Sequence, residues 1–277
     1  MRLRLVWLLA PALGSASFAL PDFFPLEPGS VRFAVIGDNG TGKAPQHEVG
    51  AMMVQTRERF PFEFVLMLGD NLYGGEKPGD YVRKFKRPYQ PLLDAGVRFH
   101  AVLGNHDDDP QRFYDGFHMG GRRYYSFARG PVRFFALDSN RLDPAQLQWL
   151  GEALADSQER WKVCYLHHPL YSSGRSHGPD RKLRSVLEPV LVKHGVDVCF
   201  AGHEHFYERL QPQNGVHHFI SGAAGQLRRG NIRPDGQTAR GYDQDRHFMI
   251  VEIAGDTLYF QAVSRTGEVI DSGIIRK

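Results

Sequence analysis

A stretch of sequence that reads FEFVLMLGDNLY, residues 62–73, changes abruptly from apolar residues to a carboxylate, an amide and a phenol. The apolar part, 62–68, has the length and composition of a buried β-strand. In a parallel sheet, residues that directly follow such a strand lie at its carboxyl edge, where α/β proteins form their sites. Gly69, Asp70 and Asn71 are also good turn formers, so this stretch alone leaves a plain strand and turn as the alternative.

Four other apolar runs end in the same way, which favours the first interpretation. Each run is followed within a few residues by carboxylate, amide or imidazole side chains: 31–36 by Asp38, 98–103 by Asn105 and His106, 162–166 by His167 and His168, and 196–201 by His203 and His205. Helical stretches at about 45–60, 80–95, 144–157 and 180–194 lie between or beside these runs. Alternation of strand and helix predicts a parallel sheet.

The chain changes character after residue 202. The apolar runs 216–220, 248–253, 257–263 and 269–275 follow one another without long helices, and one more run, 132–137, precedes Asp138. We expect the late runs to form a second, largely antiparallel sheet. The predicted fold is therefore α/β, a two-sheet β-sandwich flanked by α-helices, with a metal site at the carboxyl ends of strands.

Composition limits the class of protein. The chain has 277 residues, 42% hydrophobic content and a formal net charge of +3. This is enough apolar material for one large core, and we expect a single domain over 31–277, preceded by an extended lead-in at 20–30. The small net charge and the absence of a basic aromatic stripe argue against nucleic acid as a partner. The sequence does not determine the oligomeric state.

The amino terminus has the pattern of an export signal. Residues 1–19 contain two arginines, a short apolar segment and then small residues, which is the order found in a cleavable signal peptide. The apolar segment is too short for a membrane span. A buried N-terminal helix is the alternative, which Pro11 disfavours. We therefore predict a secreted or periplasmic protein.

The chain has two cysteines, Cys164 and Cys199, and both lie within apolar runs. Two cysteines do not make a disulfide framework even in an exported protein. We expect buried free thiols, with a single disulfide between them as the alternative.

The side chains at the strand ends are suited to metal binding. Strands in a sheet lie about 5 Å apart, so polar groups at neighbouring ends can converge. Oxygen and nitrogen ligands without cysteine suit iron, zinc or manganese rather than an iron–sulfur centre. The pair His203 and His205 is the strongest signal, and Asp70 is the natural bridge between two cations. The residues alone leave open which of His167 and His168 is a ligand.

These motifs, in this order, resemble those of the calcineurin-like metallophosphoesterases, and within them the purple acid phosphatases of the small, tartrate-resistant mammalian type. The motifs are D-x-G at 38–40, G-D-x-x-Y at 69–73, G-N-H-D at 104–107, His167 two residues before proline, and G-H-x-H at 202–205. Most of the superfamily has a histidine at position 40, where this chain has glycine. Tyr73 takes its place, as in the purple subgroup, whose tyrosinate binds ferric iron.

The resemblance implies a dinuclear centre of Fe(III) and a divalent metal, which is iron, zinc or manganese. The implied ferric ligands are Asp38, Asp70, Tyr73 and His205. The implied divalent ligands are Asp70, Asn105, His167 and His203. His106 matches the family histidine that contacts the substrate phosphate, and His177 resembles a second one, with one residue more between it and His167 than in the mammalian enzymes.

The implied activity is that of an acid phosphatase, in which a metal-bound hydroxide attacks a small-molecule phosphate monoester. A phosphodiesterase or nucleotidase with the same fold and a different metal pair is the alternative enzyme. A metal- or phosphate-binding protein without catalysis is the alternative from another class. Only residues 139–142 separate Asp138 from Asp143, where the mammalian enzymes carry a longer loop that is cut on activation. We therefore predict no proteolytic activation.

Overall fold

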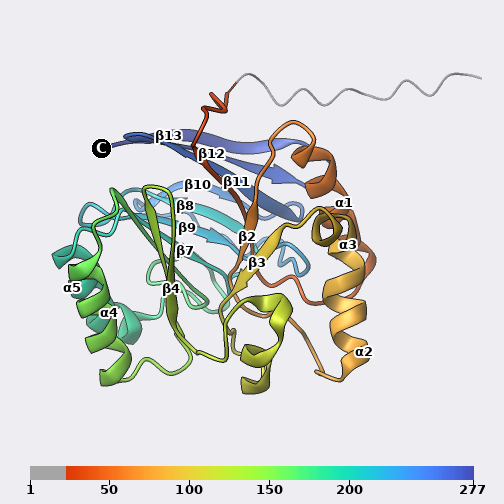
Figure 1. The fold of residues 1–277 in the computed structure, drawn as a ribbon, viewed down its shortest axis with the longest axis horizontal. Helices are drawn as coiled ribbons and strands as arrows, with labels where there is room; N and C mark the ends of the chain where they lie inside the picture. Colours follow the sequence, from red (N-terminus) through yellow and green to blue (C-terminus); the bar gives the residue numbers. More distant parts are fainter. Residues whose placement is uncertain (1–22) are drawn as a thin grey trace, which may run out of the picture.

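The computed structural model describes residues 23–277 and contains two mixed β-sheets that pack face to face, with helices outside them (Figure 1). The predicted signal peptide, 1–19, lies outside the described residues, as does the beginning of the predicted lead-in. Residues 23–30 form neither helix nor strand, and the backbone N–H groups of Leu26 and Glu27 donate hydrogen bonds to the Glu252 carboxylate.

The first sheet has the strand order β13-β12-β11-β1-β2-β3. Its three early strands run parallel to one another, and the three late ones are added antiparallel beside β1. The strands are β1 (Val31–Ile36), β2 (Phe64–Met67), β3 (Arg98–Ala101), β11 (His247–Ala254), β12 (Thr257–Ser264) and β13 (Val269–Arg276).

The second sheet has the order β10-β8-β9-β7-β6-β5-β4. Strands β5, β6, β7 and β9 are parallel. On one side β4 pairs antiparallel with β5, and on the other β8 pairs antiparallel with β9 and β10 pairs antiparallel with β8. The strands are β4 (Tyr125–Arg129), β5 (Val132–Ala136), β6 (Trp161–Leu166), β7 (Val198–Ala201), β8 (Tyr207–Leu210), β9 (His217–Ser221) and β10 (Thr238–Tyr242).

The predicted fold class is confirmed, but the predicted division of strands between the sheets is wrong. The late strands do not form a sheet of their own: β11, β12 and β13 extend the first sheet, whereas β8, β9 and β10 extend the second. Apolar periodicity indicates that a strand exists but not which strand it pairs with, because pairing depends on contacts distant in sequence. Strands β4, β8 and β10 were not predicted, since each contains charged residues that interrupt the apolar pattern.

Four helical regions match the predicted ones. They are α1 (Ala44–Arg57), a continuous stretch made of α2 (Pro78–Tyr81), the π-helix η1 (Val82–Lys86) and α3 (Arg87–Asp94), then α4 (Pro144–Asp156) and α5 (Arg181–Lys193). Asp143 and Asp180 begin the last two helices, because each carboxylate accepts a hydrogen bond from a backbone N–H of the first turn. Two short 3-10 helices, η2 (Asp109–Phe113) and η3 (Asp115–Phe117), follow β3.

The main core fills the space between the sheets. Phe33 of β1 stacks on Phe64 of the same sheet and meets Phe134 and Phe200 of the other sheet edge to face, with ring centroids 5.3 and 6.2 Å away. A second apolar cluster lies between the second sheet and helices α4 and α5, at the left of Figure 1. It includes Cys164 and Cys199, which are buried free thiols as expected. These two cores fix the carboxyl ends of the parallel strands relative to one another.

In residues 23–277, none of the helices has the length and apolar character needed to cross a membrane.

Candidate metal centre

The predicted site residues come from strand ends of both sheets. Asp38 follows β1, Asp70 and Tyr73 follow β2, and Asn105 follows β3 in the first sheet. In the second sheet, His167 follows β6, and His203 and His205 follow β7. The sequence predicted convergence at the edge of one parallel sheet. The candidate ligands instead follow strands of both sheets, at the place where the carboxyl ends of the two packed sheets meet.

A first group of these side chains surrounds the hydroxyl of Tyr73. The Tyr73 Oη lies 3.2 Å from Asp38 Oδ1, 2.7 Å from Asp70 Oδ2 and 3.4 Å from His205 Nε2. His205 Nε2 is in turn 3.3 Å from Asp38 Oδ1. One phenol, two carboxylates and one imidazole therefore point at a common space.

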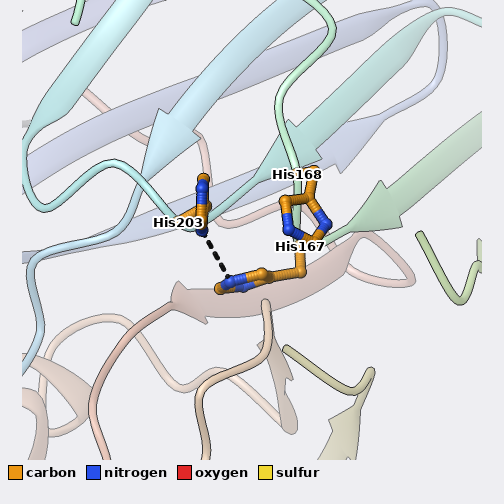
Figure 2. A group of neighbouring side chains, drawn as sticks. All are labelled: His167, His168 and His203. Carbon is orange, nitrogen blue, oxygen red and sulfur yellow. Dashed lines mark hydrogen bonds between the residues drawn. The ribbon is translucent and has the colours of Figure 1, made fainter. Parts of the chain in front are cut away.

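A second group gathers around the ring of His167. His167 Nε2 lies 2.9 Å from Asn105 Oδ1, 3.1 Å from His203 Nδ1 and 3.5 Å from Asp70 Oδ1. Figure 2 shows the rings of His167 and His203 with their close contact drawn as a dashed line. The other ring nitrogen of His167, Nδ1, is bonded to the backbone oxygen of Leu68, which fixes the ring so that Nε2 faces the site.

Asp70 belongs to both groups. Its Oδ2 faces the first group through Tyr73, and its Oδ1 faces the second through His167. The backbone N–H of His106 also donates to Oδ1, at 3.0 Å, and this contact holds the carboxylate in place. A carboxylate with one oxygen toward each group has the geometry required to bridge two cations.

Three residues of the site have a backbone conformation that residues other than glycine rarely adopt. Asp38, Asp70 and His203 have positive φ angles of 54°, 52° and 68°. Such strain is retained at functional sites when the surroundings impose it. The turns also pack very closely: a Cβ placed on Gly104 would lie 2.2 Å from Asp70 Oδ1, so any larger residue there would displace the carboxylate.

The electrostatics of the first group call for a positive charge. Burial raises the pKa of Asp38 well above its ordinary value, against the opposing charge of His167. Burial, followed by the charges of Asp38 and Asp70, also raises the pKa of the Tyr73 phenol. Buried anionic groups are stable only when paired or bound to a metal, so this donor set fits a cation.

The histidines are in the form that binds metal. Burial, followed by the charge of His167, lowers the pKa of His203 to about 2. Burial, followed by the charge of Arg228, lowers the pKa of His205 to about 4. Both rings are therefore neutral near pH 7, and a neutral imidazole is the metal-binding state.

His168 lies close enough to join the second group, within 4.8 Å of the ligand atoms of His167 and His203. Its Nδ1, however, is 2.9 Å from the Ser139 hydroxyl, and its backbone N–H donates to the same oxygen. Figure 2 shows its ring beside the other two, with no bond to either of them. His167, by contrast, contacts both Asn105 and Asp70. These contacts favour His167 over His168 as the ligand.

The two predicted catalytic histidines lie at the mouth of the site, and both are exposed. The ring of His106 lies 5.1 Å from that of Tyr73, beside the first group. The ring of His177 lies 4.3 Å from that of His203, beside the second. Despite the extra residue before it, His177 reaches the same site as His106.

Two carboxylates, one half-buried and one buried, support the site and were not assigned from the sequence. Asp107 accepts hydrogen bonds from the backbone N–H groups of Asn71, Leu72 and Gly104, at 2.8–3.0 Å, and so joins two ligand-bearing turns. Glu204, which is fully buried, accepts from the Gly178 N–H at 2.6 Å and from Asn231 Nδ2 at 3.0 Å. Glu204 could have been identified from the sequence, because it lies between the two candidate ligands His203 and His205.

Comparison with known proteins shows the family to which this sequence is similar. The sequence pattern of the calcineurin-like phosphoesterase family matches residues 31–207. Purple acid phosphatase 17 of Arabidopsis thaliana is 27% identical over 289 residues, which cover 86% of this chain and 85% of that protein. Tartrate-resistant acid phosphatase type 5 of the rabbit, Oryctolagus cuniculus, is similar as well. The resemblance inferred from the motifs is confirmed.

Solved structures show the same fold. The purple acid phosphatase PPD1 of yellow lupin, Lupinus luteus, superposes with a TM-score of 0.75 at 20% identity, over 91% of this chain and 55% of that one. GAP50, described as the anchor in the inner membrane complex of Plasmodium, superposes with a TM-score of 0.78 at 20% identity, over 90% of this chain and 89% of that one. At this identity the likeness concerns the fold alone.

Proposed function

Because the chain belongs to the calcineurin-like phosphoesterase family, we propose that it is an acid phosphatase that hydrolyses phosphate monoesters at a dinuclear metal centre. The observation that carries the proposal is the position of Asp70, whose two oxygens face two separate groups of ligand side chains. The similarity to purple acid phosphatases supports it.

The first group would hold Fe(III), since a phenol beside carboxylates offers hard anionic oxygen donors. Its members are Asp38, Asp70, Tyr73 and His205. The second group would hold a divalent iron, zinc or manganese ion through Asp70, Asn105, His167 and His203. When bound, such a pair polarises a phosphate and lowers the pKa of water.

The two exposed histidines beside the ligand groups, His106 and His177, are positioned to bind the substrate phosphate. His106 lies beside Tyr73 of the first group, and His177 lies beside His203 of the second. A phosphate between the two histidines can accept hydrogen bonds from both rings. A histidine in the protonated form can give its proton to the departing alkoxide, which assists the breaking of the phosphorus–oxygen bond. We assign this role to His106 first, because its backbone N–H is also bonded to Asp70.

Kinetics with matched aryl esters test the proposal. The protein, with its iron, zinc and manganese content measured, is assayed with 4-nitrophenyl phosphate and with bis(4-nitrophenyl) phosphate from pH 4 to 8. We expect a preference for the monoester and strong loss of activity in Asp70→Asn. Asp108→Asn is the matched control, because that aspartate is exposed at the same edge.

Two results would overturn the proposal in different ways. A preference for the diester would favour the phosphodiesterase or nucleotidase alternative. No hydrolysis of either ester by metal-loaded protein would favour a binding protein of this fold. For His106→Ala, turnover should fall while metal content stays; loss of metal instead would make its role structural.

We also propose that the protein is exported, since residues 1–19 have the order of a signal peptide. Amino-terminal sequencing of the protein recovered outside the cytoplasm tests this. A start near residue 18 or 20 is expected, and an intact Met1 would contradict it.

A further inference from the structure

An arginine outside the proposed ligand set lies against the metal centre. Arg228 belongs to the segment that follows β9, and its backbone N–H donates to the backbone oxygen of His205 at 3.0 Å. Two residues earlier, the N–H of Gln226 donates to the backbone oxygen of Asp38, also at 3.0 Å. The segment is therefore attached to two residues of the first ligand group, and the position of Arg228 is fixed relative to both.

The charge of Arg228 influences the pKa values of three residues around the metal centre. After burial, it is the largest influence that lowers the pKa of His205, and likewise that of His177. It also acts on Glu204, whose carboxylate holds the segment of His177. Coulomb interactions of this kind weaken with distance and with solvent, so the guanidinium lies on the side of the centre where His205 and His177 are found.

Within residues 23–277, no carboxylate forms an ion pair with Arg228, and its Nη1 atom is enclosed without a hydrogen-bond partner. Arg265, in contrast, is bonded to two carboxylates. A guanidinium has five N–H donors, and a buried donor left without a partner costs free energy. The free protein thus leaves part of the hydrogen-bonding capacity of Arg228 unused.

We propose that Arg228 binds a non-bridging oxygen of the substrate phosphate and thereby selects phosphate monoesters over diesters. Near neutral pH a monoester phosphate carries up to two negative charges and a diester carries one, so a fixed positive charge favours the monoester. The side chain is half-buried, and its flexible stem lets the guanidinium turn toward an anion held between His106 and His177. This inference rests on the proposed phosphatase function and adds to it the residue that sets the substrate class.

The test compares Arg228→Met, which keeps the aliphatic stem, with Arg228→Lys, which keeps the charge. Arg229→Met is the matched control, since Arg229 is the next residue and is exposed. Steady-state kinetics use 4-nitrophenyl phosphate and bis(4-nitrophenyl) phosphate on holoenzyme of equal metal content. A second readout is independent of turnover: the rise in melting temperature caused by inorganic phosphate.

For Arg228→Met we expect kcat/KM for the monoester to fall about tenfold, as for the loss of one partly exposed charged hydrogen bond. The value for the diester should change less than about threefold, and the stabilisation by phosphate should shrink. Arg228→Lys should recover part of both effects, and Arg229→Met should behave as wild type.

Equal losses for both esters with unchanged stabilisation by phosphate would overturn the assignment of Arg228. Loss of metal in Arg228→Met would also overturn it, since the residue would then act on the centre and not on the substrate. If the wild-type protein hydrolyses neither ester, the proposed function fails, and the effect of phosphate on the melting temperature still decides the role of Arg228.

Discussion

The hydroxyl of Tyr73 lies 2.7 Å from Oδ2 of Asp70, three residues earlier in the same turn. The turn that follows β2 therefore supplies both an anion that can bridge two cations and a phenol directed at the same space. The Asp70 side chain is buried at this edge of the sheet, and that of Tyr73 is half-buried.

This arrangement predicts a coloured protein. If Fe(III) occupies the first group, the purified oxidised protein should show a tyrosinate-to-iron charge-transfer band in the visible range. Tyr73→Phe should abolish the band, because no other phenol is placed in that group. Tyr124→Phe is a suitable control. A colourless protein with zinc or manganese at both positions would contradict the iron assignment.

Glu204→Gln should disturb the segment that carries His177 while leaving metal content unchanged. The carboxylate accepts from Gly178 and Asn231, and an amide NH₂ facing one of those donors would leave it unpaired. We expect a loss of about 1–3 kcal/mol in the free energy of unfolding and a change in the pH–rate profile. Glu152→Gln, on the exposed face of α4, is the control. An unchanged profile would show that the segment does not depend on Glu204.

A buried histidine away from the site predicts weaker stability in acid. His100 stacks on Phe127 at 4.1 Å, and burial lowers its pKa to about 3, against an ordinary value of 6.5. Between these two pH values the unfolded chain binds a proton that the folded chain does not. The free energy of unfolding therefore falls as pH falls from 6.5 toward 3, by about 1.4 kcal/mol per pH unit for this group.

Denaturant unfolding of wild type and His100→Phe checks this prediction. The variant removes the titrating group. Below pH 6.5 its free energy of unfolding should therefore change with pH less steeply than that of wild type, by about 1.4 kcal/mol per pH unit. The difference between the two proteins above pH 7, where the imidazole is neutral, measures the change in packing alone. Parallel curves from pH 4 to 6.5 would show that His100 does not contribute.

Residues 139–142 should not act as a cleavable cover over the site. The segment is short, and its Asn140 side chain donates to the backbone oxygens of Leu103 and Gly104, each at 3.1 Å. Ser139 is bonded to His168. Limited proteolysis, followed by mass spectrometry and activity assays, should give no increase in turnover from a cut here. A several-fold increase that accompanied such a cut would contradict the prediction.

The sequence predicted the parts of the fold that depend on local pattern. Buried parallel strands are continuously apolar, so the ends of β1, β2, β3, β6 and β7 were visible as changes of composition. The pairing partner of each late strand was not visible in the sequence, because pairing joins distant segments: β11 pairs with β1 across more than two hundred residues. For the same reason the contacts of Asp107, Glu204 and Arg228 became apparent only in the folded chain.

The separation in sequence between the two sets of ligands has a consequence for how the protein matures. Asp38 and Asp70 follow β1 and β2 of the first sheet, whereas His203 and His205 follow β7 of the other sheet. No fragment that ends before residue 205 contains all the candidate ligands of both groups, so a nascent chain cannot assemble the pair before that residue has been synthesised and both sheets have docked. Uptake of cations would then follow completed folding. A chelator should therefore lower the free energy of unfolding of the finished protein and leave the rate of refolding largely unchanged.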